Sequence, residues 1–236
     1  MITPDTIRLK VREHYRDALI SGSCGCGDCC GADSAADQSA VTSLVGPSLG
    51  CGTPVALADL RPGEVVVDLG SGAGGDVLRA AREVGPSGRS IGVDMTPEMV
   101  AAARANAARA DLGHAEFRLG EIEHLPLPDG SADVIISNCV INLVPDKPRA
   151  FAEAYRVLRP GGRLVVSDMV SHGPLPDAIR ADPAAWAACI AGAVSSEEYA
   201  AAIAGAGFES IAVLAAGDAV PGQIYSVTIR ALKPVS

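Results

Sequence analysis

Cysteine is the reactive residue type that stands out in this 236-residue chain, which contains seven of them. An odd number of cysteines is a poor basis for a disulfide framework and indicates metal, metalloid or redox chemistry instead. Three of the cysteines are isolated in the sequence, and four share the short glycine-rich segment 21–31. The isolated ones are Cys51, Cys139 and Cys189, and the group consists of Cys24, Cys26, Cys29 and Cys30.

A glycine-rich turn at 68–76 is the second feature that could do chemistry. Its glycines at 70, 72 and 75 match the spacing of a dinucleotide-binding turn, and Asp94 ends the next predicted strand. However, a pyrophosphate would face the carboxylates of Asp68 and Asp76, where it needs amide N–H groups. A cationic cofactor reverses this objection. S-adenosylmethionine carries a sulfonium, an ammonium and a ribose diol but no phosphate, so Asp68 can hold the ammonium side and Asp94 the diol.

The isolated cysteines stand in segments that could meet beside this turn. Cys139 follows the predicted strand 132–137, Cys51 lies in the turn-rich segment 49–54, and Cys189 lies in a predicted helix near 183–193. In an open parallel sheet the substrate binds outside the carboxyl ends of the strands, where Cys139 should lie. Three thiolates from separate segments can converge on one soft, three-coordinate centre.

The segment after strand 132–137 lacks the residues that usually act as a base. Residues 137–143 include no His, Lys, Asp or Glu, although enzymes that methylate oxygen or nitrogen usually place one near the target. Trivalent arsenic fits this segment, because it binds three sulfurs as a pyramid and keeps a lone pair. That lone pair is itself the nucleophile and needs no deprotonation.

The elements that must position these residues alternate regularly along the chain. Strands are predicted at 65–69, 90–93, 116–119, 132–137 and 164–168, separated by helices that include 76–84, one beginning at 97 and 148–158. This alternation predicts an α/β fold with a doubly wound parallel sheet. Residues 159–162, Arg-Pro-Gly-Gly, should form the turn before the fifth strand.

The ends of the chain depart from the alternation. A helix is predicted at 3–20 with Thr3 as its cap, followed by a weaker helix at 35–44. After residue 170 we expect an insertion, a helix opened by a capping box at 195–198, and two last strands at 211–214 and 225–231. We therefore divide the chain into an N-terminal helical, cysteine-rich extension (1–50), a cofactor-binding core (51–170), and an insertion with the last strands (171–236).

The composition limits which classes of partner the protein could bind and in which compartment we expect it. The net charge is −9, which argues against nucleic acid or an anionic membrane as partner, and the 48% of hydrophobic residues excludes disorder of most of the chain. The longest apolar run, near 184–194, is too short to span a bilayer, and the N-terminus has no apolar signal region. We expect a cytoplasmic protein, whose thiols stay reduced.

The sequence resembles the class I S-adenosylmethionine-dependent methyltransferases. The resemblance is carried by the run at 68–74, Asp94, the segment 120–123 and the turn 159–162. It implies a Rossmann-like, seven-stranded methyltransferase sheet, with Ile122 and Glu123 flanking the adenine and Met95 against its other face. The cofactor-binding residues expected are Asp68, Gly70, Ser71, Gly72, Asp94, Met95, Ile122, Glu123 and Asn138.

Within that class, the sequence is similar to the arsenite methyltransferases. The matching segments are 50–54, 94–99, 136–143 and 189–193. The resemblance implies that Cys139 and Cys189 bind arsenic, that Cys51 binds arsenic or acts in redox, and that Cys29 or Cys30 contributes a further thiol. The catalytic residues would be Cys51, Cys139 and Cys189, in a detoxification reaction.

The same resemblance suggests the reaction partners. Arsenite or methylarsenite would arrive as a glutathione complex, and a thioredoxin-type reductant would restore oxidised cysteines. A disulfide of Cys51 with Cys139 or Cys189 would be a resting form.

Two other readings of the sequence stay open. The chain could methylate a small organic, quinone-like substrate with its cysteines incidental, since a lone cysteine is often only a small buried apolar residue. It could also be a non-catalytic protein that binds a metalloid or zinc, with Cys24, Cys26, Cys29 and Cys30 as a zinc knot.

Overall fold

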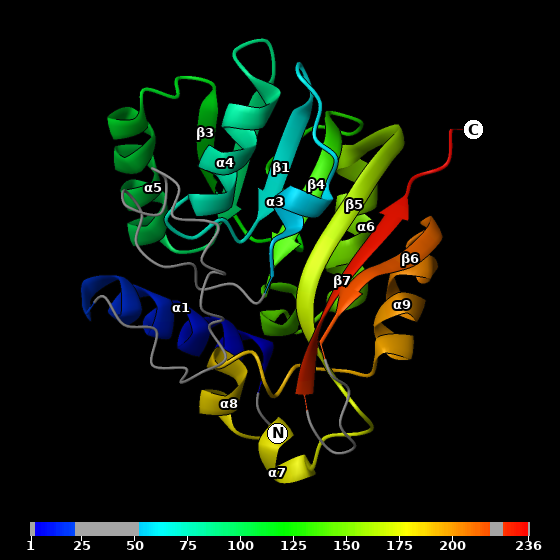
Figure 1. The fold of residues 1–236 in the computed structure, drawn as a ribbon. Helices are drawn as coiled ribbons and strands as arrows, with labels where there is room; N and C mark the ends of the chain where they lie inside the picture. Colours follow the sequence, from blue (N-terminus) through cyan, green and yellow to red (C-terminus); the bar gives the residue numbers. More distant parts are fainter. Residues whose placement is uncertain (1–2, 22–51, 218–223, 236) are drawn as a thin grey trace.

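A seven-stranded sheet forms the centre of the molecule (Figure 1). The computed structural model describes residues 3–21, 52–217 and 224–235. The strand order is β3-β2-β1-β4-β5-β7-β6, in which the first five strands are parallel and β7 runs antiparallel to both neighbours. The strands are β1 (Val65–Leu69), β2 (Arg89–Asp94), β3 (Ala115–Leu119), β4 (Ala132–Asn138), β5 (Leu158–Ser171), β6 (Glu209–Ala216) and β7 (Ile224–Leu232).

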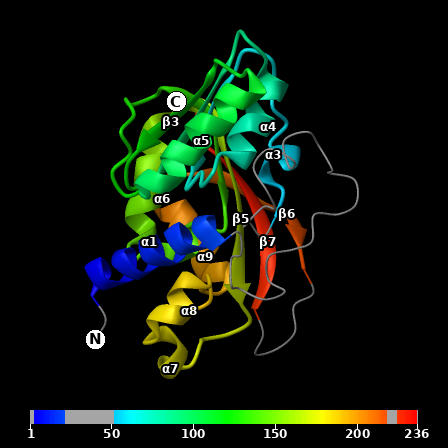
Figure 2. The ribbon, with the colours of Figure 1, turned by 90° about the vertical axis from the view of Figure 1, so that its left-hand side faces the viewer.

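Helices cover both faces of the sheet (Figures 1 and 2). On one face lie α3 (Pro54–Leu57), α4 (Gly75–Val84) and α5 (Pro97–Ala110), and on the other α6 (Lys147–Val157) and α9 (Ser196–Gly205). The middle strands are therefore buried on both sides, as the apolar runs 65–67 of β1 and 134–136 of β4 require. This is the doubly wound, Rossmann-like methyltransferase sheet that the sequence predicts.

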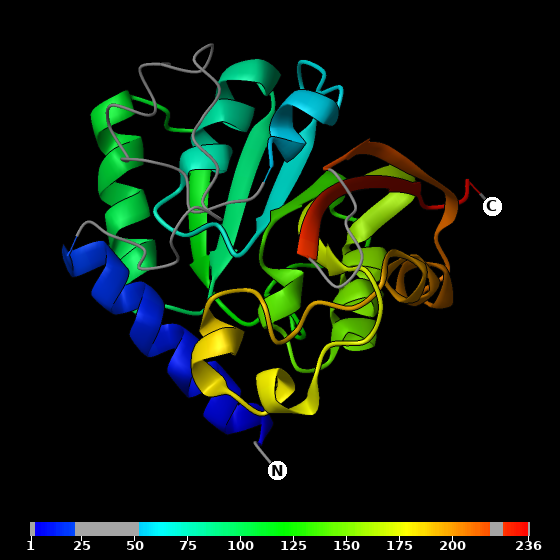
Figure 3. The same cartoon turned by 60° about the horizontal axis from the view of Figure 1, so that its bottom comes forward.

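A third group of elements closes one end of the sheet. The N-terminal helix α1 (Pro4–Ser21) packs against α8 (Pro183–Ala187), α5 and the short 3₁₀ helix η2 (Ile141–Leu143), which follows β4. Figure 3, which brings this end forward, shows α1 crossing it with α8 and the four-residue α7 (Asp177–Arg180) alongside. The elements after β4 and β5 and the chain's first helix thus meet at the edge where a substrate is expected.

Helix starts follow the sequence signals in most places. Thr3 Oγ1 accepts a hydrogen bond from the backbone N–H of Thr6, and Ser195 and Glu198 form the predicted capping box. Thr96 is the N-cap of α5, as expected, but its side chain makes no capping hydrogen bond. The backbone N–H of Thr96 instead donates to the carboxylate of Asp94 at 2.8 Å.

Two predicted elements differ from the structure, and a third cannot be compared with it. Residues 159–162 belong to β5 rather than to a turn before it, and the pairing with β4 shifts register there. The insertion contains α7, which the sequence did not suggest, and α8 ends at Ala187, so Cys189 lies beyond the helix. The predicted helix 35–44 lies outside the described residues.

Within the described parts of the chain, no helix has both the length and the apolar character to cross a membrane.

Candidate active site

The glycine turn after β1 leaves open space on one side. Gly70, Gly72 and Gly74 all have positive φ, of 69°, 50° and 93°, which favours glycine. A Cβ on Gly70 would strike the side chain of Val140, whereas a Cβ on Gly72 would meet no atom within 4 Å. Gly70 is therefore required by packing, and Gly72 borders free space that a cofactor can fill.

Carboxylates gather around this turn. Asp68 is 3% exposed, and its burial, together with the nearby carboxylates of Asp76 and Asp94, raises its pKa well above the usual value. Burial also raises the pKa of Asp94, against the opposing effect of hydrogen bonds from the N–H groups of Thr96 and Gly72 (2.8 and 2.9 Å). Such a group of one buried and two half-buried acids is costly unless positive charge comes near. This group of carboxylates thus fits a cationic cofactor such as S-adenosylmethionine and disfavours a phosphate.

Asn138 lies at the end of β4, and both the nitrogen and the oxygen of its side-chain amide form hydrogen bonds. Its Nδ2 donates to the Gly52 carbonyl (2.9 Å) and to Asp76 Oδ2 (3.0 Å), and its Oδ1 accepts from the Gly52 N–H (3.2 Å). Asn138 therefore joins the segment that precedes α3 to the start of α4. This places it beside the acidic turn.

The residues expected around the adenine lie toward α1. Ile122 and Glu123 are buried, and the Glu123 carboxylate pairs with the Arg8 guanidinium of α1 at 2.8 Å. Ser71 is also buried, and its hydroxyl has no hydrogen-bond partner among the described residues. Met95, which follows Asp94, packs toward Cys139 and Cys189.

Cys139 and Cys189 lie together in one buried group, which we call the cysteine cluster. Cys139 is 2% exposed and Cys189 7%, and the Cys189 thiol donates a hydrogen bond to the Cys139 carbonyl oxygen at 3.2 Å. The rest of the cluster is mostly apolar and comes from α1, η2 and the ends of the strands. Its members are Ile7, Val11, Cys139, Leu143 and Cys189, with Tyr15, Met95, Met169 and Trp186 packed against them.

The backbone is left-handed at both cysteines. Their φ values are 56° and 60°, and only three other non-glycine residues among those described have positive φ. The N–H of Cys139 donates to the Ser167 carbonyl of β5 (2.8 Å), and the N–H of Cys189 donates to the Trp186 carbonyl (3.0 Å). A left-handed residue that is not glycine costs free energy, and such residues gather at functional sites.

The two cysteines differ in oxidation state. Cys139 is disulfide-bonded, and the Cys189 side chain is a thiol. Cys51 and the four-cysteine group lie outside the described residues. The structure therefore brings together two of the three predicted catalytic cysteines.

Two charged residues near the cluster were not expected from the sequence. Asp168, within β5, accepts hydrogen bonds from the Asn142 N–H (3.1 Å) and the Tyr199 hydroxyl (3.2 Å), and burial raises its pKa to about 6. Lys147 opens α6, and burial lowers its pKa to about 8, although the charges of Asp168 and Cys189 oppose this. An acid as the last residue of the predicted strand 164–168 was a visible signal for Asp168. Nothing comparable marked Lys147.

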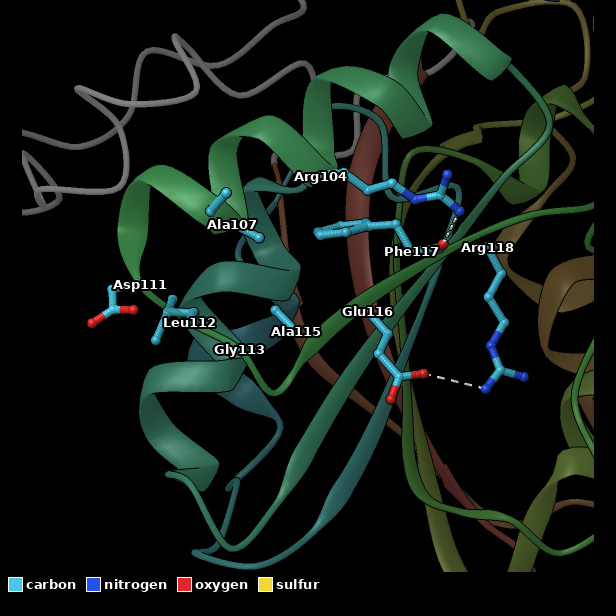
Figure 4. A pocket seen from close by; sticks show the side chains of 10 residues that line it. Arg104, Ala107, Asp111, Leu112, Gly113, Ala115, Glu116, Phe117 and Arg118 are labelled. Carbon is cyan, nitrogen blue, oxygen red and sulfur yellow. Dashed lines mark hydrogen bonds and ion pairs between the residues drawn. The ribbon is translucent and has the colours of Figure 1, made fainter.

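A hollow of about 540 Å³ lies elsewhere, between α5 and the edge strand β3 (Figure 4). Arg104 crosses it to donate a hydrogen bond to the Phe117 carbonyl, and Glu116 pairs with Arg118 at 3.3 Å. None of the predicted site residues line this hollow, so it is separate from the candidate active site.

Comparison with known proteins identifies the family. Residues 60–207 match a family model described as a methyltransferase domain. The chain is 46% identical over 231 residues to the arsenite methyltransferase of Halobacterium salinarum, covering 89% of this chain and 59% of the relative. It is 38% identical over 144 residues to the human arsenite methyltransferase, covering 57% of this chain and 38% of the relative.

A solved structure agrees with these relatives. CrArsM, an arsenic (III) S-adenosylmethionine methyltransferase from Chlamydomonas reinhardtii, superimposes with a TM-score of 0.70 at 33% identity, covering 95% of this chain and 74% of that chain. The chain spans 59% of the length of its Halobacterium relative and less of the human one. By its sheet, its acidic glycine turn and these matches, the chain belongs to the methyltransferase-domain family, in which the proteins named here as similar to it are arsenic(III) methyltransferases.

Proposed function

We propose that the protein transfers a methyl group from S-adenosylmethionine to trivalent arsenic held by cysteine thiolates. One observation carries the proposal: the cysteine cluster adjoins the cofactor turn. Val140, the residue after Cys139, packs on Gly70, and Met95, the residue after Asp94, packs on the cluster. A group held by Cys139 and Cys189 would therefore lie next to a cofactor bound at Asp68 and Asp94.

In the binding step, arsenite arrives as a glutathione complex and exchanges its ligands for protein thiols. Each exchange forms one As–S bond to the protein and releases a thiol or water, without a change in oxidation state. Cys139 and Cys189 are the described ligands, and we assign the third position to Cys51. The apolar side chains of the cluster exclude water from the arsenic.

S-adenosylmethionine, when bound, supplies a methyl group attached to positively charged sulfur. The chain contributes chiefly by positioning. Asp68 and Asp94 hold the cationic and ribose ends, Gly72 gives room, and the two cysteines aim the arsenic lone pair at the methyl carbon. Because the lone pair carries no proton, no base is needed, in agreement with the composition of residues 137–143.

Methylation raises arsenic to the pentavalent state, so the cycle requires two electrons. We propose that two thiolates leave arsenic as a disulfide, which returns the arsenic to the trivalent state. A thioredoxin-type dithiol then reduces that disulfide and is itself oxidised. The disulfide at Cys139 supports this assignment, since an oxidised Cys139 must be reduced before it can bind arsenic.

The test is an assay with labelled S-adenosylmethionine, glutathione, thioredoxin with its reductase, and arsenite. We expect label in methylated arsenic for the parent protein, and none for Cys139→Ser or Cys189→Ser. Binding of S-adenosylhomocysteine, measured by calorimetry, should be unchanged in both variants, which separates the arsenic site from the cofactor site. Retained turnover in both variants would overturn the proposal.

The same assay separates the other readings. Transfer of label to an organic, quinone-like acceptor with arsenite omitted would indicate a methyltransferase of small organic molecules. Absence of both transfer and cofactor binding would indicate a non-catalytic binding protein. Among the described residues, no group of three or more metal-ligating side chains is placed to hold a metal ion.

A further inference from the structure

We propose that Tyr15 of α1 is a positioning residue of the arsenic site: its hydroxyl donates a hydrogen bond to the Cys189 sulfur and keeps that sulfur aimed at arsenic. The inference rests on the proposed function, because it assumes that Cys189 binds arsenic. It adds a residue from the N-terminal helix to a site otherwise built after β4 and in the insertion.

The direction of this hydrogen bond follows from the partners of Cys189. The Tyr15 oxygen lies 3.6 Å from the Cys189 sulfur, within hydrogen-bond distance for sulfur. The same sulfur lies 3.2 Å from the Cys139 carbonyl oxygen, which can only accept. A thiol has one proton, and in Cys189 that proton forms the hydrogen bond to the carbonyl oxygen. Between Tyr15 and Cys189 the hydroxyl is therefore the donor.

This bond gains importance when arsenic binds. As the As–S bond forms, the thiol proton leaves with a hydroxyl ligand of arsenic as water, so the hydrogen bond to Cys139 is lost. The bond from Tyr15 needs no thiol proton and persists. Sulfur bound to arsenic carries more negative charge than a thiol, and hydrogen bonds to charged acceptors are the stronger ones. Tyr15 thus holds the sulfur in the state that reacts.

Cys189 needs such support because of its place in the chain. It follows the five-residue helix α8 and has a left-handed backbone, so no regular element continues through it. The helix α1 packs along α8 and places Ile7 and Val11 inside the cysteine cluster. An ion pair of 2.8 Å between Arg8 and Glu123 fixes the same helix near the expected cofactor site. The helix that carries Tyr15 is therefore fixed by contacts other than that of the Tyr15 hydroxyl.

The variant that isolates the hydroxyl is Tyr15→Phe, which keeps the ring in the cluster. Its matched control is Tyr225→Phe, which removes a hydroxyl that donates to Ser196 at 3.4 Å, between β7 and α9. Trp186, the only tryptophan of the chain, packs against the cluster and reports arsenite binding by its fluorescence. Binding and release of arsenite are measured on the full chain, reduced with a phosphine so that no small thiol competes.

We expect Tyr15→Phe to raise the arsenite Kd about fivefold, the effect of losing one hydrogen bond, mainly through faster release. The arsenite KM should rise in parallel, and the KM for S-adenosylmethionine should stay unchanged. Tyr225→Phe should change none of these values. A general loosening of the fold would instead raise both KM values and lower the unfolding temperature.

Two results would overturn the proposal. If Cys189→Ser abolishes arsenite binding but Tyr15→Phe binds and releases arsenite like the parent, Tyr15 has no positioning role and the proposed function stands. If Cys189→Ser binds arsenite as tightly as the parent, the assignment of Cys189 fails, and the inference about Tyr15 fails with it.

Discussion

The thiol of Cys189 donates a hydrogen bond to the backbone carbonyl of Cys139, across fifty positions of sequence and 3.2 Å of space. Both residues adopt left-handed backbone conformations, and both are buried in one cluster. Two strained cysteines in contact have no evident value for folding, because glycine would adopt either conformation at lower cost. A function that requires both sulfur atoms at these positions would explain why the strained backbone is kept.

This relationship predicts that two substitutions of Cys189 differ in their effect on stability but not in their effect on arsenite binding. Cys189→Gly should be more stable than Cys189→Ala by about 1 kcal/mol, because glycine adopts a φ of 60° without strain. Both variants should lose arsenite binding, since both lack the sulfur. Urea unfolding measures the first effect and Trp186 fluorescence the second. Equal stability of the two variants would show that the left-handed conformation at Cys189 is not a source of strain.

The sequence was sufficient to predict the sheet but not the surroundings of the cysteines. β1 was predicted at its observed bounds, and the capping box at Ser195 was found, because both depend on local patterns. The extension of β5 through 159–162 was missed, since a Pro-Gly-Gly run usually ends a strand, and here it is accommodated by a shift of register.

The site itself could be predicted only where a residue type revealed it. The acids of the glycine turn and the isolated cysteines are visible as residue types, so Asp68, Asp94, Cys139 and Cys189 could be selected. The contact of Tyr15 with Cys189 joins residues 174 positions apart, and no local pattern indicates it. The left-handed backbone at the cysteines was equally hidden, because cysteine has no preference for it.

Buried Asp168 predicts a specific pH dependence of stability. Its pKa is raised from 3.8 to about 6, so the folded protein binds this proton more tightly than the unfolded chain. Protonated Asp168 therefore contributes about 3 kcal/mol to the free energy of unfolding. This contribution is fully present below about pH 4 and is lost as the pH rises through about 6. Asp168→Asn should lack this contribution, although it also loses an acceptor for the Asn142 N–H and is less stable throughout.

The measurement is urea unfolding of both proteins between pH 4 and pH 7. The difference in unfolding free energy between parent and variant should shrink as the pH rises. Taking the difference removes the groups that act in the opposite sense, such as Glu64 and Glu153, whose pKa values are lowered by Arg163 and Arg156. A difference independent of pH would mean that Asp168 does not titrate in this range.

The ion pair between Arg8 and Glu123 should hold α1 on the body of the protein. Glu123 is only 4% exposed, so Arg8→Met would leave a buried carboxylate without its partner. We expect a loss of about 1–3 kcal/mol of unfolding free energy, most of it recovered in the double variant with Glu123→Gln. A double-mutant cycle measures this coupling. Additive effects of the two substitutions would show that the pair does not secure the helix.

Substitution by alanine should have different effects at two glycines of the cofactor turn. Gly70→Ala places a methyl group against Val140, so its main effect should be a loss of stability of about 1–3 kcal/mol, partly restored by Val140→Ala. Gly72→Ala places a methyl group in the open space beside the acids. Its strain at a φ of 50° should cost only about 1 kcal/mol, but it should weaken S-adenosylhomocysteine binding.

Thermal unfolding and calorimetric titration of S-adenosylhomocysteine separate these outcomes. Because both substitutions add the same methyl group at positive φ, two residues apart, each serves as the control for the other. The two variants differ in whether the added methyl group lies in the space expected for the cofactor. If Gly72→Ala bound S-adenosylhomocysteine as tightly as the parent, the space beside Gly72 would not be the cofactor site, and the methyl donor would have to lie elsewhere along the carboxyl ends of β1 and β2.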